Sequence, residues 1–279
     1  MKGIWVWLVL GIITIWVAIW SLPDKNLHVI FCDVGQGDAI LLTLGTTQVL
    51  VDGGPGQKVQ GCLSRHMPFY DRRIEIIMLT HAEADHMTGL ADVIERYLVL
   101  QFVEGPVGKK SVAYERLKAD IDGADIGQVR VTGGDIIRVG DLAVEVVWPE
   151  AQYVLGMESE SKSLNNFSLG MTVKYGGFEV FLSGDGDNQI EGLEIEGGRL
   201  SDVEVLKVPH HGSRTGMTPE WLGVLKPELA VVSAGRDNSY GHPASESLKM
   251  LKEVEARVAV TYERGDVEVV SDGKEWWMK

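Results

Sequence analysis

The segment "LTHAEADHMTGL" (79–90) places two histidines and two carboxylates close together, directly after an apolar run. These residues are His81, Glu83, Asp85 and His86, and imidazole and carboxylate groups are the usual ligands of first-row divalent metals. Alternate residues of an extended turn point the same way, so His81 and Glu83 can serve one metal. Asp85 and His86, at the start of the next helix, can serve a second metal. The simpler interpretation is a helix start whose acidic residues complement the helix dipole.

Other strand-like runs stop at the same kinds of residue. The run in "LVDGG" stops at Asp52, that in "FLSGD" at Asp185, and that in "LKVPHHG" at His210 and His211. When neighbouring strands end at one edge of a sheet, such side chains converge there and can hold two metals. His242, in the loop "YGHP", is a further candidate. Four of the seven histidines lie in the two tight clusters, so the pattern favours a metal site over isolated turn residues and helix caps.

Two series of short apolar runs supply the strands that must position these residues. Each run is rich in Val, Ile and Leu, and we expect strands within 27–35, 39–44, 47–54 and 74–81, and then within 142–149, 168–187, 203–212 and 229–235. Helices are expected at 87–100, 219–226 and 244–256. Continuous apolar strands are buried on both faces, so helices should cover the sheets on the outside. The pattern predicts an α/β fold with two packed sheets, a helical layer on each side, and a linker at 149–166 between the halves.

The composition is that of a folded protein and not of a disordered one, with 279 residues, 45% hydrophobic and 24% charged. A formal net charge of −14 repels nucleic acid and anionic lipid at long range. A phosphate-bearing partner must therefore be attracted by a local feature. The only small basic clusters are "RR" (72–73) and "GKK" (108–110), so the sequence has no basic stripe of the kind that non-specific DNA-binding proteins usually carry.

Cys32 and Cys62 are the only cysteines in the sequence, and neither has the CxxC spacing of a zinc or redox site. Two cysteines cannot form the disulfide framework of a small secreted domain. Because Cys32 lies in an apolar strand-like run, we expect it to be a core residue without a bridge to Cys62.

The amino terminus differs from the rest of the chain because residues 3–22 are apolar and carry no charge. A helix that crosses a bilayer core needs about 20 such residues, and tryptophans lie near both ends of the stretch. A cleaved signal peptide would have a shorter apolar core, of about 7–15 residues, and small residues at its end, whereas "AIWSLP" has bulky ones. We expect an uncleaved, single-pass membrane anchor within 1–25, and a domain over 26–279 outside the cytoplasm.

The cluster at His81 resembles the H-x-[HDE]-x-D-H signature of the metallo-β-lactamase superfamily. More narrowly, the sequence is similar to the carboxy-terminal hydrolase domain of the ComEC competence proteins of bacterial DNA uptake. Six motifs in order carry this resemblance, which covers 27–279: "DVGQGDAILL" (33–42), "LVDGG" (50–54), "LTHAEADHMTGL" (79–90), "NNFSLGMTVKYGGFEVFLSGD" (165–185), "LKVPHHGSRTG" (206–216) and "NSYGHP" (238–243).

The resemblance implies an αββα sandwich and hydrolysis of phosphodiester bonds with the help of two divalent metal ions. Zinc or manganese is the expected metal, with iron as an alternative. The implied substrate is DNA, in particular a single strand, which the domain would degrade outside the cytoplasmic membrane. Competence or transport proteins are the implied partners.

Carried over to this sequence, the resemblance assigns ligand roles to His81, Glu83, Asp85 and His86. It makes Asp185 the bridge between the metals, and His211, or alternatively His210, completes the second metal. Catalytic roles fall to Asp85, His210 and His242, of which His242 is alternatively a ligand or a phosphate contact. Asp52 would hydrogen-bond a ligand, and the remaining residues expected to support the site or contact substrate are Asp33, Gln36, Asp38, Asn166 and Ser213.

Two departures from the family pattern bear on the expected activity. Related competence domains usually carry Asp at the position of Glu83, whereas Glu there is typical of the flavodiiron branch, which reduces oxygen or nitric oxide. That branch also needs a histidine between the motif and Asp185, and none occurs from 87 to 184. The sequence is also compatible with a small-molecule phosphodiesterase similar to phosphocholine esterases, and with a non-catalytic binding module.

Overall fold

The computed structural model describes residues 5, 7, 9–12, 23–155 and 163–279. Most of the expected membrane anchor within 1–25 lies outside the described residues. Within the described ranges, no helix combines the length and the apolar character needed to cross a bilayer.

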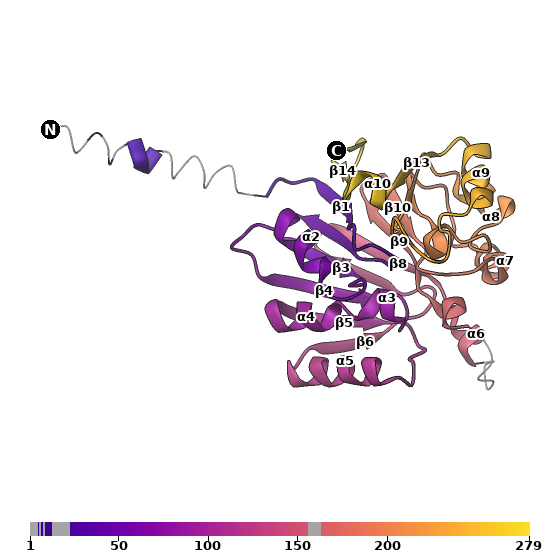
Figure 1. Ribbon diagram of the computed structural model, residues 1–279, viewed down its shortest axis with the longest axis horizontal. Helices are drawn as coiled ribbons and strands as arrows, with labels where there is room; N and C mark the ends of the chain where they lie inside the picture. The colour runs from indigo at the N-terminus through magenta and orange to yellow at the C-terminus, as the bar shows by residue number, and fades with distance from the viewer. Residues whose placement is uncertain (1–4, 6, 8, 13–22, 156–162) are drawn as a thin grey trace.

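The first of two sheets has eight strands in the order β15-β14-β1-β2-β3-β4-β5-β6. Figure 1 shows that it joins strands from early and late in the chain, since yellow β14 lies beside indigo β1. Its strands are β1 (Leu27–Phe31), β2 (Ile40–Leu44), β3 (Thr47–Val51), β4 (Arg73–Leu79), β5 (Leu98–Glu104), β6 (Gly127–Arg130), β14 (Val267–Ser271) and β15 (Trp276–Met278).

The second sheet has seven strands in the order β13-β12-β11-β10-β9-β8-β7. These are β7 (Ile136–Val139), β8 (Leu142–Trp148), β9 (Gly170–Tyr175), β10 (Phe178–Leu182), β11 (Val205–Lys207), β12 (Leu229–Val232) and β13 (Arg257–Val260). The prediction that 149–166 joins the two halves is wrong, because this stretch connects β8 to β9, which pair antiparallel in one sheet. The chain changes sheets between β6 and β7 instead. Loop composition marks where a strand ends, but it does not reveal which strands pair.

Helices cover both outer faces of the paired sheets. Those packed on the first sheet are α2 (Lys58–His66), α3 (Ala84–Met87), α4 (Leu90–Arg96) and α5 (Val112–Gly123). Those packed on the second sheet are α7 (Asn188–Glu196), α8 (Pro219–Leu225), α9 (Ser245–Glu253) and α10 (Thr261–Arg264). Three short elements lie in loops: α6 (Ala151–Leu155) and the 3₁₀ turns η1 (Leu164–Phe167) and η2 (Pro209–Gly212).

The side chains of each central strand alternate between two hydrophobic cores. In β4, Ile76 and Met78 pack between the sheets, whereas Ile77 and Leu79 pack against the helices outside. Burying an aliphatic side chain contributes about 1.5–3 kcal/mol, so strands enclosed on both faces read as unbroken apolar runs. The two-sheet α/β architecture expected from those runs is confirmed.

The expected helix at 87–100 is wrong in part, because α4 ends at Arg96 and β5 begins at Leu98. The apolar residues of 98–103 fit a helical spacing, but they pair with β4 as a parallel strand. The helices expected at 219–226 and 244–256 are confirmed as α8 and α9.

The expectation that Cys32 and Cys62 remain unbridged is also wrong. They form a disulfide between the residue after β1 and helix α2, with Cα atoms 5.7 Å apart, and both residues are buried. Helix α2 packs on the face of the first sheet that carries Cys32. This packing brings together two residues that are 30 positions apart in the sequence, and their spacing alone does not indicate it.

Candidate metal centre

The candidate site lies where strands of both sheets end at a shared edge. Strands β3 and β4 run parallel, and Asp52 and His81 follow their carboxyl ends. Strands β10 and β11 are also parallel, and Asp185 and His211 follow them. Parallel strands that end together place the residues beyond them at one edge of the sheet. The packing of the two sheets then brings both pairs of loops together.

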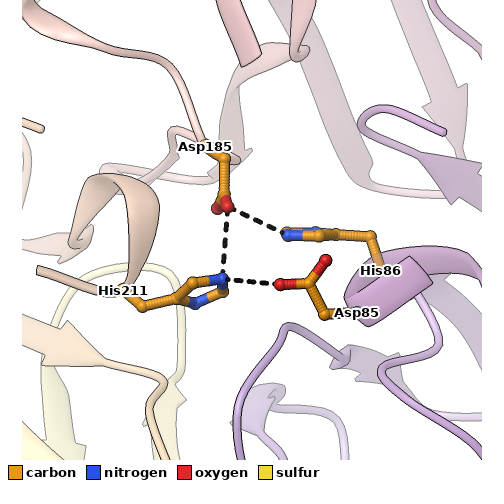
Figure 2. Close-up of side chains that lie close together, drawn as sticks. All are labelled: Asp85, His86, Asp185 and His211. Carbon is orange, nitrogen blue, oxygen red and sulfur yellow. Dashed lines mark ion pairs between the residues drawn. The ribbon is translucent and has the colours of Figure 1, made fainter. Parts of the chain in front are cut away.

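Four side chains gather at this edge: Asp85 and His86 of α3, Asp185 after β10, and His211 in η2 (Figure 2). Each offers one ligand atom, and these atoms all lie within 4.8 Å of one another. Oδ2 of Asp185 is 3.2 Å from Nε2 of His86 and 3.2 Å from Nε2 of His211. Nε2 of His211 is also 3.5 Å from Oδ2 of Asp85. Two imidazoles and two carboxylates at such spacing can surround a divalent cation.

Unpaired nitrogen atoms show that the residues fit a cation. Nε2 atoms of His81, His86 and His211 are buried and have no hydrogen-bond partner. The rings of His81 and His86 lie with centroids 4.2 Å apart. A buried polar atom without a partner costs about 1–3 kcal/mol, and a bound cation would remove that cost. Burial, together with neighbouring His86, holds the pKa of His81 well below its usual value, which favours the neutral ring that a metal ligand must be.

Hydrogen bonds from outside the cluster orient its imidazoles. Oδ2 of Asp52 accepts a bond from Nδ1 of His86 at 2.8 Å, and Asp52 itself is fixed by the backbone N–H and hydroxyl of Thr80, at 2.8 and 2.7 Å. Nδ1 of His211 donates to the carbonyl oxygen of Ser233 at 2.9 Å. Because Nδ1 of His86 and of His211 is hydrogen-bonded, Nε2 of each ring is free to face the middle of the cluster. Histidine ligands in metal sites are commonly oriented by such a hydrogen bond from the other ring nitrogen.

The loop that carries His211 has a strained backbone. His210 and His211 both adopt left-handed conformations, with φ of 48° and 56°, and Asp52 has φ of 59°. Such conformations cost of order 1–3 kcal/mol each in residues other than glycine, and they concentrate at functional sites. Neighbouring groups hold this loop in place. A side chain at Gly212 would collide with Pro243, and the Gly212 carbonyl accepts a hydrogen bond from the Ala244 backbone N–H at 2.8 Å.

Lys207 is a member of the site that the sequence analysis did not identify. It is fully buried, and its ammonium group contacts the Asp38 carboxylate, the Gly184 carbonyl at 2.9 Å and Oδ1 of Asp185 at 3.4 Å. One oxygen of Asp185 therefore faces Lys207 while the other faces the imidazoles. A lysine inside the apolar run "VLKVP" was the available signal, since an unpaired buried charge is rarely tolerated.

In the four-residue cluster, neighbouring opposite charges shift the pKa values more than burial does. Burial would raise the pKa of Asp185, but His211, His86 and Lys207 hold it well below its usual range. Burial also disfavours the charged form of His211, yet nearby carboxylates, led by Asp185, raise its pKa to about 9. Burial would also raise the pKa of Asp85, but the neighbouring His211 and His86 lower it to about 2. The carboxylates are thus ionised and arranged around positive charge.

Comparison with known families identifies this arrangement. Residues 47–261 match the model of the beta-lactamase superfamily domain, and this match covers most of the chain. The chain belongs to the metallo-β-lactamase superfamily. The four residues of the cluster all lie within the matched range.

Relatives in this superfamily include competence proteins. ComE operon protein 3 of Bacillus subtilis is 29% identical over 261 residues, which is 85% of this chain and 32% of that protein. Competence protein ComA of Neisseria gonorrhoeae is 26% identical over 231 residues, which is 80% of this chain and 29% of that protein. The chain thus spans about a third of the length of these relatives, and it resembles their metallo-β-lactamase domain.

A solved structure agrees on the fold. The metallo-beta-lactamase fold protein YhfI of Bacillus subtilis has a TM-score of 0.55 to this chain at 10% identity, and the match covers 91% of this chain and all of that one. At so low an identity the likeness concerns the fold alone.

Glu83 lies apart from the four-residue cluster. Its side chain is 37% exposed and pairs with Lys109, whose Nζ is 3.5 Å from Oε1. The structure therefore does not bring its carboxylate to the other ligands, and its role as a ligand stays a prediction.

The remaining residues named from the sequence are not members of the four-residue cluster. Nδ1 of His210 lies 3.0 Å from Oδ1 of Asp187, and His242 has a buried Nδ1 without a hydrogen-bond partner, with its ring centroid 6.4 Å from that of His211. The others make local contacts: Asp33 accepts from the Gly35 backbone, Gln36 accepts from the Gly235 backbone, Asn166 donates to Gln189, and Ser213 lies 3.3 Å from the Thr215 hydroxyl.

Proposed function

We propose that this domain is a metal-dependent phosphodiesterase that cleaves DNA outside the cytoplasmic membrane. The observation that carries the proposal is the cluster of Asp85, His86, Asp185 and His211, in which buried imidazole nitrogens without hydrogen-bond partners face two ionised carboxylates. Membership of the superfamily supports metal-dependent hydrolysis. The competence proteins among its relatives favour DNA as the substrate.

The four cluster residues would hold the first cation. When bound, it would polarise the phosphate and lower the pKa of a bound water to about 7. His86 and His211 are already oriented by Asp52 and Ser233 for this role. His81, whose buried Nε2 has no partner, is available for a second cation. Glu83 would join it only by leaving Lys109.

His210 and His242 are the candidates for protonating the leaving oxygen. Their ring centroids are 5.8 Å apart, and His242 also lies beside His211 of the cluster. Oδ1 of Asp187 accepts a hydrogen bond from Nδ1 of His210, and Nε2 of His210 lies 3.4 Å from Nδ2 of Asn165. Imidazole is suited to this step because it can donate a proton near neutral pH.

The disulfide between Cys32 and Cys62 supports a location outside the cytoplasm. Disulfides persist in oxidising compartments and are rare in the cytosol. Together with the apolar stretch at residues 3–22, this favours a membrane-anchored domain on the extracytoplasmic side, where it would act with competence or transport proteins.

Replacing Asp185 by Asn in the full chain tests the proposal. We expect at least about a 100-fold loss of phosphodiester hydrolysis and of metal affinity, because the variant removes a carboxylate that would bind the metal directly. Even residues that only hydrogen-bond a metal ligand lower metal affinity or activity by about 10–100-fold when they are replaced. Asp85→Asn, at a partly exposed residue, is the second variant, and Asp202→Asn, on the exposed loop before β11, is the control that keeps activity.

Activity should be measured on single-stranded DNA, double-stranded DNA, RNA and small phosphodiesters, with zinc or manganese, and metal content by mass spectrometry. Full activity in Asp185→Asn and Asp85→Asn would disprove the metal centre. Turnover of small phosphodiesters alone would contradict DNA as the substrate and favour a phosphocholine-esterase-like enzyme.

A further inference from the structure

Three neighbouring rings lead from the surface to the metal cluster. The ring of Tyr240 stacks on His242 with centroids 5.6 Å apart and an interplanar angle of 24°. The ring of His242 in turn lies 6.4 Å from that of His211, at an angle of 33°. Tyr240 is 71% exposed, whereas His211 is buried among the cluster residues. An aromatic face open to solvent is therefore one side chain away from a candidate metal ligand.

The loop that presents Tyr240 is rigidly built. The carboxamide of Asn238 donates to the carbonyls of Gly235 and His242, at 2.7 and 2.6 Å. Its oxygen accepts from the backbone N–H groups of Tyr240 and His242, at 3.2 and 2.9 Å. One side chain thus closes the turn from both sides, so that Tyr240 points outward while His242 lies against the site.

The same loop is fixed to the segment that carries the metal ligand. Ala244 donates its backbone N–H to the carbonyl of Gly212, and Ser247 donates its hydroxyl to the carbonyl of Ser213 at 2.7 Å. Single exposed aromatic residues are common on protein surfaces and need no explanation. Here the ring is held by a bonded turn at a set position relative to His211, which is the property that a binding surface requires.

The charges of the protein do not favour binding of a nucleic acid through its phosphates. The protein carries a net charge of −14, and the arginines of the two adjoining loops are already engaged. Arg214 pairs with Glu246 at 3.1 Å, and Arg236 donates to the Tyr262 carbonyl at 2.6 Å. Stacking on an aromatic ring does not depend on net charge, so it can hold a nucleic acid where phosphate attraction is weak.

We propose that Tyr240 is a stacking site for a nucleobase of single-stranded nucleic acid whose phosphate lies at the metal cluster. This inference rests on the proposed function and restricts its substrate to nucleic acid with unpaired bases. A base is joined to its phosphate through one sugar, and the Tyr240 ring lies one side chain from His211, so a single nucleotide can reach both. Because every base has a stacking face, the site would select unpaired bases without selecting their sequence.

Binding can be measured apart from catalysis. The full chain in mild detergent and EDTA is titrated with fluorescent oligothymidylate, and with an oligonucleotide of equal length whose central nucleotides are abasic. Stacking contributes about 1–3 kcal/mol per base, so Tyr240→Ala should weaken oligothymidylate binding by about 5- to 150-fold. Binding of the abasic oligonucleotide should change much less.

Matched variants separate stacking from other effects. Tyr240→Phe keeps the ring and should bind oligothymidylate like the wild type. Phe69→Ala removes another exposed aromatic ring, 80% exposed in the loop between α2 and β4, and should leave binding unchanged. Thermal unfolding of each variant reports whether it folds. Equal losses for oligothymidylate and for the abasic strand in Tyr240→Ala, or no loss for either, would overturn the proposal.

Activity with added manganese distinguishes this inference from the proposed function. In Tyr240→Ala, the ratio of kcat/KM for oligothymidylate to kcat/KM for a small phosphodiester should fall. A wild-type chain that binds through Tyr240 but cleaves no phosphodiester would refute the proposed function alone. A wild-type chain that cleaves DNA while the ratio stays constant would refute the stacking site alone. If Tyr240→Ala lowered kcat/KM only for a phosphocholine ester, the ring would bind a quaternary ammonium group, and the stacking site would also be refuted.

Discussion

Lys207 and its carboxylate partners make the site an arrangement of balanced buried charges. The ammonium group contacts Asp38 and Asp185, and all three side chains are almost entirely buried. Removing one partner of such a group leaves uncompensated charge in the interior, which usually costs 3–5 kcal/mol. Lys207 thus positions Asp185 for the cluster, although it does not itself belong to the ligand set.

Replacing Lys207 by Met should therefore lower the free energy of unfolding by about 3 kcal/mol. Lys174→Met is the matched control, because Lys174 pairs with Glu145 and Glu179 from the same sheet but is partly exposed. Exposed ion pairs contribute about 0–1 kcal/mol, so this variant should lose little. Urea unfolding of both variants without added metal gives the comparison, and equal stability of the two would contradict the balancing role of Lys207.

At the scale of elements, the packing of α7 against α8 buries two carboxyl groups that are not members of the metal cluster. Glu194 accepts a hydrogen bond from the Trp221 indole at 2.7 Å, and burial raises its pKa from 4.5 to about 8. Glu191 bonds to the Thr218 hydroxyl, and burial raises its pKa from 4.5 to about 7. Both groups are therefore protonated in the folded protein at pH values where the unfolded chain has lost the proton.

Stability should consequently decrease as the pH rises from about 4.5 toward 8. The stabilisation by protonated Glu194 is fully present below pH 4.5, its pKa in the unfolded chain. It is lost progressively as the pH rises to about 8, its pKa in the folded protein. Within that window Glu194 alone should remove about 1.4 kcal/mol per pH unit. Glu194→Gln should flatten the curve, whereas Glu196→Gln, at an exposed position of the same helix, should not. Parallel curves for wild type and Glu194→Gln, measured by urea unfolding, would rule out this account.

The disulfide joins another pair of elements, the end of β1 and helix α2. Cross-linking residues 30 positions apart stabilises a protein mainly by restricting its unfolded chain, typically by 2–4 kcal/mol. Exchanging both Cys32 and Cys62 for Ala, or reducing the wild type with dithiothreitol, should lower the unfolding free energy by about 3 kcal/mol. Dithiothreitol should not affect the double variant, and an unchanged wild type after reduction would contradict the stabilising role.

At the scale of the whole molecule, the sequence predicts the parts that depend on local pattern. Apolar runs such as 74–81 became strands because their residues are buried on both faces, and the polar residues that close them mark the site edge. Residue types and spacing also pointed to Asp85, His86, Asp185 and His211, which the fold gathers into one cluster.

Features that depend on which helices and strands pack together could not be predicted from the sequence. The pairing of β8 with β9 across 149–166, the disulfide of Cys32 with Cys62, and the contact of Lys207 with Asp38 all join positions distant in the sequence. The separation of Glu83 from the cluster is of the same kind, since it follows from the direction of the turn before α3 and from the nearby Lys109. Tertiary packing decides each of these, and one sequence does not encode it in a visible pattern.

The order of the first sheet has a consequence for biosynthesis. Strand β1 lies between β2 and β14, and the contact between His28 and Glu268 joins residues 240 positions apart. While the ribosome is still translating the second half of the chain, β1 therefore has a neighbour on one side only. The nascent domain must keep this exposed backbone away from other chains until its last strands emerge.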